Sequence, residues 1–268
     1  MPTLTPIAPG TAPSLDDAEA RLPDAPTKNH LHEKLASLGP ALDRLQTAMY
    51  AEGKRGLLVV LQARDAGGKD GVVRNVFGLF NPQGLAIRSF GVPTPVELGH
   101  DYLWRVHSAM GARGLITVFN RSHYEDVLVV RVHGLVPEPV WRKRYDQINA
   151  FERMLVENGY GVLKFFLHVS RDEQRERFED RLKDPEKSWK FREGDLEERA
   201  RWDEYTAAYR DMLARCSTPE APWFVVPADS KPMRDVLIAE TLLRTLDGMG
   251  LKYPETPVSV LAWKGKVR

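Results

Sequence analysis

The sequence predicts an α/β fold in which a parallel β-sheet is flanked by helices on both sides. Two observations carry this prediction. Short apolar runs, often rich in β-branched residues, alternate along the chain with longer amphipathic segments, as in sheets whose strands are connected by helices. The first apolar run also leads directly into a glycine-rich segment, ARDAGGKD at 63–70, and an amphipathic segment follows it. This order is typical of a phosphate-binding loop.

The first long helix is expected at 31–53. Its leucines recur at steps of three or four residues, which places them on one face. Gly39 and Pro40 mark the position at which this helix would bend, and Gly53 is expected to end it.

The other elements follow from apolar runs and from breaks at glycine and proline. We predict strands at 57–61, 85–94, 113–122, 160–170 and 221–229. We predict helices at 72–80, 95–110, 123–134, 137–159, 171–215 and 231–249.

Length and composition limit the class of protein. The 268 residues suit one large domain or a domain with an insertion, and 43% hydrophobic with 28% charged residues is ordinary for a globular chain. A formal charge of +1 provides no global field, so we expect neither nucleic acid nor membrane as a partner. Cys216, the single cysteine, excludes a disulfide framework and a cysteine-based zinc site, and the scattered histidines lack metal-ligand spacing.

The chain is expected to divide into an N-terminal arm at 1–30, one domain at 31–250 and a tail at 251–268. The arm is rich in proline and has no signal-peptide pattern, so it is either disordered or draped over a partner subunit. No apolar stretch approaches the roughly 18 residues that span a bilayer, and we expect a cytoplasmic protein. The segment at about 171–215, where charge density rises, is the best candidate for an inserted module.

The loop at 63–70 departs from the usual G-x-x-x-x-G-K-[ST] pattern at two positions. Gly68 and Lys69 match, whereas alanine replaces the first glycine and Asp70 replaces the hydroxyl residue. Ala66 and Gly67 are still small enough for backbone N–H groups to approach phosphate, and Lys69 adds a positive charge. The alternative is a glycine-rich turn with a charged tip.

Asp65 is the expected substitute for the missing hydroxyl. A carboxylate beside phosphates requires a cation or a proton between them. We therefore interpret Asp65 as a magnesium ligand, or as the group that deprotonates or orients an attacking oxygen. Asp70, at the start of the helix, would favour the helix dipole.

A second polar group follows the strand at 113–122, at the carboxyl edge where ligands bind in such sheets. Asn120 would be a weak, neutral metal ligand, and Glu125 and Asp126 follow closely enough to supply charge. Arg121 would neutralise charge on a transferring phosphoryl group. Alternatively, Arg121 forms a structural ion pair with Asp126 or Glu125.

The module at 171–215 resembles a helical lid that folds over phosphates. Arg177 and Arg181 are four residues apart on one helical face, and further basic residues crowd around a proline-containing bend. The alternative is a solvated face with internal ion pairs. Asp195 and Glu198 have the spacing of a capping box for the next helix, whose aromatic stripe is expected in the core.

Four blocks of this chain, QARDAGGKDGVVRNVF, FNRSHYEDVLVVRVHG, RLKDPEKSWKF and APWFVVPADSK, together resemble the family-2 polyphosphate kinases over roughly residues 30–250. The resemblance implies a P-loop NTPase-like, thymidylate-kinase-like α/β fold with a parallel sheet flanked by helices and a helical lid. It also implies reversible phosphoryl transfer between inorganic polyphosphate and a nucleotide, with magnesium as cofactor. A homodimer or homotetramer is expected.

The block FNRSHYED is similar to the class III branch, whose members phosphorylate both AMP and ADP, so that AMP is carried to ATP. Carried over by position, the catalytic residues are Asp65, Lys69 and Arg121. The residues expected to contact phosphate or polyphosphate are Ala66, Gly67, Gly68, Lys69, Asp70, Arg177, Arg181, Lys183, Lys187 and Lys190. The expected nucleotide contacts are Arg64, Arg74, Glu125 and Asp126, and the expected metal ligands are Asp65 and Asn120.

Two other functions remain open at this point. A nucleoside monophosphate kinase that uses ATP as donor would share the loop, the lid and magnesium. A non-catalytic module that binds nucleotides or polyanions would bind without turnover.

Overall fold

The computed structural model describes residues 2–261, 263 and 265–266, and its centre is a five-stranded parallel sheet in the order β2-β3-β1-β4-β5. The strands are β1 (Gly56–Ala63), β2 (Leu85–Ser89), β3 (Ile116–Asn120), β4 (Tyr160–His168) and β5 (Trp223–Pro227). The predicted fold class is confirmed, and every predicted strand is present, although most are shorter than expected.

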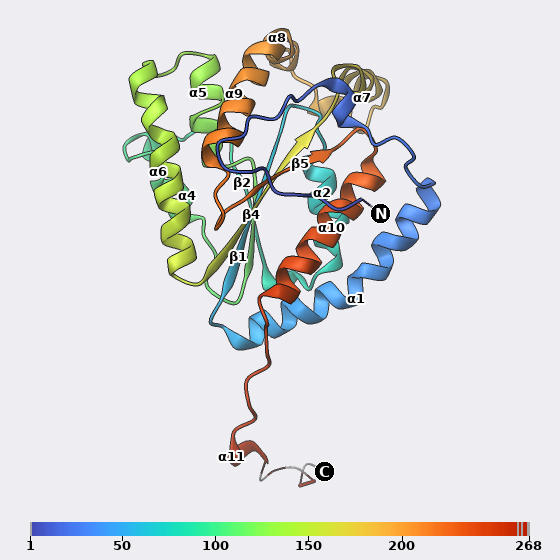
Figure 1. Cartoon of the computed structure of the whole chain (residues 1–268), viewed down its shortest axis with the longest axis vertical. Coiled ribbons are helices and arrows are strands. Elements are labelled where there is room, and N and C mark those ends of the chain that lie inside the picture. The colour runs from blue at the N-terminus through green and yellow to red at the C-terminus, as the bar shows by residue number, and fades with distance from the viewer. Residues whose placement is uncertain (1, 262, 264, 267–268) are drawn as a thin grey trace.

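Helices cover both faces of this sheet (Figure 1). They are α1 (Lys28–Glu52), α2 (Lys69–Asn75), α3 (Pro95–Leu98), α4 (Trp104–Ser108), α5 (Val129–Val132), α6 (Glu138–Glu157), α7 (Arg171–Lys183), α8 (Gly194–Ala200), α9 (Trp202–Cys216), α10 (Lys231–Gly248) and α11 (Val258–Leu261). Short 3-10 turns occur at η1 (Asp17–Ala20), η2 (Phe77–Leu79), η3 (Pro82–Gly84), η4 (His123–Asp126) and η5 (Ser188–Lys190).

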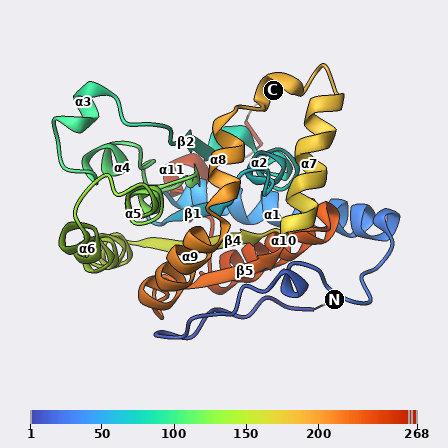
Figure 2. The same cartoon turned by 90° about the horizontal axis from the view of Figure 1, so that it is seen from above.

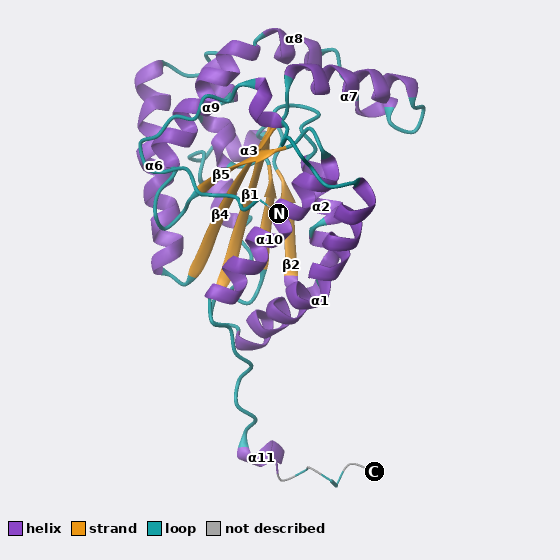
Figure 3. Ribbon diagram, turned by 45° about the vertical axis from the view of Figure 1, so that its right-hand side comes forward, coloured by secondary structure: helices purple, strands orange, loops and turns teal. Residues whose placement is uncertain are grey.

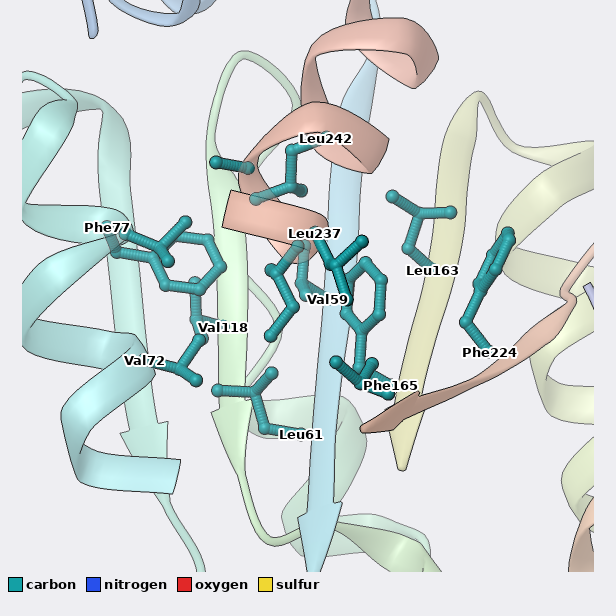
Figure 4. Packing of buried hydrophobic residues seen from close by; sticks show 14 of the residues in the cluster. Val59, Leu61, Val72, Phe77, Val118, Leu163, Phe165, Phe224, Leu237 and Leu242 are labelled. Atoms are coloured by element: carbon teal, nitrogen blue, oxygen red, sulfur yellow. The ribbon is translucent and has the colours of Figure 1, made fainter. Parts of the chain in front are cut away.

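Strand β1 lies at the middle of the sheet, and all of its residues are buried. Because side chains alternate across a strand, Val59 and Leu61 face one core with α1, α2 and α10 (Figure 4). Leu58 and Val60 face a second core with α6 and α9. A strand buried on both faces needs the near-continuous apolar run from which it was predicted.

Capping residues determine where helix α1 begins and ends. The side chain of Thr27 accepts a hydrogen bond from the His30 N–H at its start. Gly53 ends it in the left-handed conformation, as predicted. Pro40 lies inside the helix, which continues through it.

The predicted helix at 72–80 begins earlier, at Lys69, and ends at Asn75 before the turn η2. Two other predicted helices are each divided in two. The segment 95–110 forms two short helices, because Gly99 ends α3 and Asp101 instead accepts a hydrogen bond from Leu103 N–H. The segment 123–134 divides into η4 and α5, since the Ser122 side chain bonds the Tyr124 N–H in a turn that competes with a regular helix.

The charged module at 171–215 is helical; its α7 and α8 lie above the carboxyl ends of the strands, whereas α9 packs along one face of the sheet (Figure 3). It comprises α7, η5, α8 and α9. The predicted capping box is wrong: Asp195 lies inside α8, and the residue before that helix, Glu193, makes no capping hydrogen bond. The aromatic stripe of α9 is buried as expected, at Trp202, Tyr205 and Tyr209.

The N-terminal segment lies along the β5 side of the sheet (Figure 2). The Ile7 N–H donates to the Trp223 carbonyl over 2.8 Å, and the Asp229 N–H donates to the Ala20 carbonyl over 3.1 Å. The segment therefore packs on this chain's own sheet, an arrangement different from the two that were expected.

The division into arm, domain and tail stays a prediction. Met1 of the predicted arm and positions 262, 264 and 267–268 of the predicted tail lie outside the described residues. No helix in the described part of the chain has the length and apolarity to cross a bilayer.

Candidate functional site

The loop at 63–70 connects β1 to α2 through two residues in the left-handed region. Ala66 has a φ of 58° and Gly68 a φ of 97°. A Cβ added to Gly67 would lie 2.5 Å from the Ala63 Cβ, so no side chain fits there. The small residues of this loop are thus required by its own tight path.

Lys69 is buried at the first position of α2 and turns back over the loop. Its Nζ donates to the Ala63 carbonyl over 2.9 Å. Burial lowers the pKa of Lys69 to about 8, and the positive charge of Arg121 adds to this effect. Because this ammonium group is removed from water, an incoming phosphate would stabilise its positive charge more strongly than that of an exposed lysine.

Arg121 joins the end of β3 to the loop. Its Nη2 lies 2.6 Å from Asp65 Oδ1, and its Nη1 lies 3.5 Å from Glu125 Oε2. Burial alone would lower the pKa of Arg121, but Glu125 and Asp65 outweigh it and raise the pKa. The structure therefore brings three predicted site residues together, and Arg121 pairs with Asp65 as well as with Glu125.

Asp126 faces a different partner. Its Oδ1 accepts a hydrogen bond from Arg144 Nη1 over 2.8 Å. Burial raises the pKa of Asp126, although Arg144 opposes this. The structure thus pairs Asp126 with Arg144, on α6, and of the two carboxylates named as alternative partners of Arg121 it is Glu125 that lies beside it.

Asn120 and Asp70 link the strand end, the loop and the charged module. The Asn120 amide donates to Asp70 Oδ1 over 2.8 Å, and Lys190 Nζ lies 3.8 Å from Asp70 Oδ2. The Asp70 side chain is 70% exposed, so it faces solvent beside the loop. The structure therefore brings Lys190 close to the loop that it was predicted to cover.

Arg64 is buried against α9. Its guanidinium lies 3.8 Å from the centre of the Trp202 ring, and it donates to the Trp202 carbonyl and to the Thr206 hydroxyl. Burial lowers the pKa of Arg64 to about 10. Here Arg64 attaches the loop to α9, while Arg74, also expected to contact nucleotide, is exposed on α2.

Arg177 and Arg181 have different surroundings, although both were expected to bind polyphosphate. Arg177 is buried and donates to the carbonyls of Ala66 and Ala228, at 2.9 and 2.6 Å. Arg181 is more exposed, with Nη1 3.9 Å from Asp195 Oδ2. Arg177 therefore attaches α7 to the loop.

Lys183 and Lys187, also expected to bind polyphosphate, are exposed and paired with neighbours on their own segment. Lys183 lies 3.6 Å from Glu179, and Lys187 bonds Asp184. Such exposed pairs contribute little to stability, so these side chains are available to an anionic ligand.

Arg234, which was not among the predicted site residues, lies against Gly68 of the loop. It is on α10 and is 1% exposed, with Nε and Nη2 both bonded to Asp235 Oδ1. A Cβ on Gly68 would lie only 2.0 Å from Arg234 Nη1. Its signal was the Arg-Asp pair in the first turn of the last helix, directly after the APWFVVPADSK block.

A buried charged network supports the turn that carries Glu125. Lys164 on β4 bonds Glu152 and the Tyr124 hydroxyl, and Glu152 also contacts His123. Burial by itself would raise the pKa of Glu152, but Lys164 and His123 lower it. His123 and Tyr124 thus pack in the interior.

The oxygen atoms beside Arg121 suit a hard divalent cation. Asp65, Glu125 and the Asn120 side-chain oxygen are ligands of the type that magnesium prefers. Among the described residues, no three histidine, cysteine, aspartate or glutamate side chains gather into a complete site. Magnesium is commonly held by one or two carboxylates together with substrate phosphates, so the residues fit that mode.

Comparison with known proteins yields a consistent group. The model of the family Polyphosphate kinase 2 (PPK2) matches residues 26–254. The AMP/ADP-polyphosphate phosphotransferase of Meiothermus ruber is 55% identical over 83% of this chain and 84% of its own. The ADP-polyphosphate phosphotransferase of Rhodopseudomonas palustris is 44% identical over 86% of this chain and 84% of its own.

A solved structure agrees with these relatives. The crystal structure of polyphosphate kinase 2 from Arthrobacter aurescens TC1 superposes with a TM-score of 0.89 at 37% identity, covering 100% of this chain and 99% of that one.

Proposed function

Because this chain belongs to the polyphosphate kinase 2 family, we propose that it transfers a phosphoryl group reversibly between inorganic polyphosphate and AMP or ADP. The relative from Meiothermus ruber, which is named for both acceptors, supports this range of nucleotides. The observation that carries the proposal is the convergence of Lys69, Arg121 and Asp65 at the loop after β1.

In this mechanism the protein positions phosphates and neutralises their charge. The loop and Lys69 hold the reacting phosphoryl group, and Arg121 stabilises the negative charge that develops on its oxygens. The transfer is in line, and no covalent enzyme intermediate is required. Asp65, which binds Arg121 through Oδ1, also orients the attacking phosphate oxygen of the acceptor.

Magnesium is the cofactor that we propose for this reaction. Asp65 and Asn120 would hold it, with Glu125 as a further carboxylate beside them. When bound, the ion neutralises phosphate charge. Lys69 and Arg121 together balance Asp65 and Glu125, so the phosphates of the substrates bring uncompensated negative charge, which a cation would offset.

The module from α7 to α9 is proposed as the lid. Lys183, Lys187 and Lys190 are among its exposed cations, and Lys190 already lies near Asp70. Closure over the phosphates would exclude water, which favours transfer to a nucleotide over hydrolysis.

The nucleotide is proposed to bind on the β3 side of the loop, where Glu125 lies. Arg74 is exposed on α2 and free of the packing that holds Arg64, so it is the more accessible of the two arginines expected there. A direct contact with Arg64 or Asp126 requires either side chain to leave its partner in this structure.

The decisive experiment supplies AMP, polyphosphate and magnesium without ATP. The appearance of ADP, and then of ATP, supports the proposal. Product formed only with ATP as donor would instead identify a nucleoside monophosphate kinase. Binding without turnover would identify a non-catalytic module.

Replacement of Lys69 tests the role of the loop. Lys69→Ala removes the ammonium group that faces the phosphates, so turnover should fall by about three orders of magnitude. The matched control is Lys54→Ala, an exposed lysine before β1, at the other end of the sheet. Undiminished turnover of Lys69→Ala, with thermal unfolding confirming the fold, would reject this role.

We also propose a cytoplasmic homo-oligomer, a dimer or tetramer, that acts without nucleic acid or membrane. AMP and ADP are cytoplasmic metabolites, which supports the location. Light scattering coupled to size-exclusion chromatography measures the assembly directly, and a monomeric mass at working concentration would contradict it.

A further inference from the structure

The amino end of α10 presents a buried arginine to the outer side of the phosphate-binding loop. Arg234 is bonded to Asp235 through Nε and Nη2, whereas its Nη1 lies against Gly68. Within the described residues, nothing accepts a hydrogen bond from Nη1. A guanidinium donor left open at a phosphate-binding loop is suited to an anionic oxygen.

Lys231, the first residue of α10, extends this basic group towards solvent. Partial burial lowers the pKa of Lys231, and the positive charges of Arg177 and Arg234 lower it further. Asp235 and Glu173 already accept bonds from Arg234 and Arg177, so they do not neutralise Lys231 fully. The amino end of this long helix adds its own positive potential.

The two flanks of the loop therefore differ in chemistry. On the β3 flank, Asp65 and Glu125 place carboxylates around Arg121, which suits a metal ion and a nucleotide. On the α10 flank, Arg234 Nη1 lies against Gly68 of the loop, and Lys231 is a further, exposed cation at the start of the same helix. In an in-line transfer the attacking and leaving oxygens lie on opposite sides of the phosphorus. With the acceptor on the β3 flank, the donor extends along the α10 flank.

We infer that the polyphosphate chain, beyond the phosphoryl group that is transferred, lies across the amino end of α10 and contacts Lys231 and Arg234 Nη1. This inference rests on the proposed function, because it assigns a path to the donor of that reaction. The ligand class is a linear inorganic polyanion, which needs cations at regular intervals and offers no ring for stacking.

Charge reversal at the exposed residue provides the test, because Lys231 is not part of the core. Lys231→Glu should raise the KM for long-chain polyphosphate by about tenfold, the loss expected for one charged hydrogen bond. The KM for tripolyphosphate should change much less, since a short donor does not reach beyond the loop. The slope of log KM against log salt should fall by about one.

Two further variants sharpen the result. Lys54→Glu makes the same charge change at the amino end of the sheet and should leave both KM values as in the wild type. Arg234→Lys keeps a positive charge near Asp235 but removes the fork that reaches Gly68. It should also weaken long-chain binding, and thermal unfolding should verify its fold.

The outcomes separate this inference from the proposed function. A wild-type enzyme that makes no nucleotide product from polyphosphate rejects the proposed function and the inference together. If the wild type uses polyphosphate but Lys231→Glu behaves like Lys54→Glu, only the inference is wrong. Equal rises for long and short donors, or a rise confined to the nucleotide KM, also overturn it.

Discussion

Replacement of Gly68 by alanine tests whether Arg234 and the left-handed loop residue together determine the shape of the site. At a φ of 97°, a side chain costs about 1–2 kcal/mol of backbone strain. The new Cβ would also lie 2.0 Å from Arg234 Nη1, so the guanidinium must move. Moving it weakens two bonds to Asp235, which costs about 1.5–3 kcal/mol.

These effects predict a loss of about 2.5 to 5 kcal/mol in the free energy of unfolding. The melting temperature should fall by roughly 5–20 °C for a chain of this size. Urea denaturation, followed by circular dichroism, measures the loss. The KM for polyphosphate should rise as well, because the loop amides move with the Gly68 backbone.

The matched control is Gly78→Ala, in η2. It has an ordinary backbone conformation, and a Cβ there would meet no heavy atom within 4 Å. Its free energy of unfolding should change by less than about 0.5 kcal/mol. The reasoning would be refuted if Gly68→Ala were as stable as Gly78→Ala.

Other predictions concern protonation and the buried network. The pKa of Lys69 in the free enzyme is about 8, below its ordinary value, so the ammonium group is present below pH 8 and lost above it. The value of kcat/KM for polyphosphate should therefore decline above about pH 8. A flat profile from pH 7 to 9.5 would contradict this. Lys164→Met leaves Glu152 buried without its cation, so unfolding free energy should fall by about 3–5 kcal/mol. Adding Glu152→Gln should recover part of that loss, and a double variant less stable than Lys164→Met would show that the burial of an unpaired charge is not the cause.

Much of the site could be predicted because its chemistry is local in the sequence. The segment from Leu57 to Asp70 contains a buried strand, a loop of small residues and a helix start, and each has its own pattern. The position of Arg121 at a strand end followed from the same alternation of strands and helices. Because β1 pairs with β3 in parallel, the loop after β1 and Arg121 after β3 lie side by side.

The roles of Arg177 and Arg181 could not be separated by spacing. Both lie on one face of α7, yet only Arg177 is close enough to the loop to reach the Ala66 carbonyl. Which carbonyl a side chain meets depends on how far the helix extends past the sheet, and helical periodicity carries no such information. For the same reason, the sequence does not show that Arg64, which follows β1 directly, packs against α9.

Arg234 was missed because its contact is long-range. It lies more than 160 positions beyond Gly68, and an Arg-Asp pair early in a helix is usually a surface feature. The break at Gly99 to Asp101 was missed for a different reason: the apolar spacing on either side of it fits one continuous helix. There the hydrogen bond from Leu103 N–H to Asp101 decides the local conformation.

The segment that carries Ile7 has a consequence for how copies of this protein can associate. The border strand of a sheet offers unpaired backbone groups on which another chain can add a strand. At β5 the Trp223 carbonyl is already taken by Ile7, and the Ser217 hydroxyl holds the Ile7 carbonyl in turn. Growth of a continuous intermolecular sheet past β5 is therefore blocked while this segment stays in place. If copies of this chain associate, the contacts would form through helical surfaces or at the β2 border, and detaching the segment would expose the β5 border to strand addition.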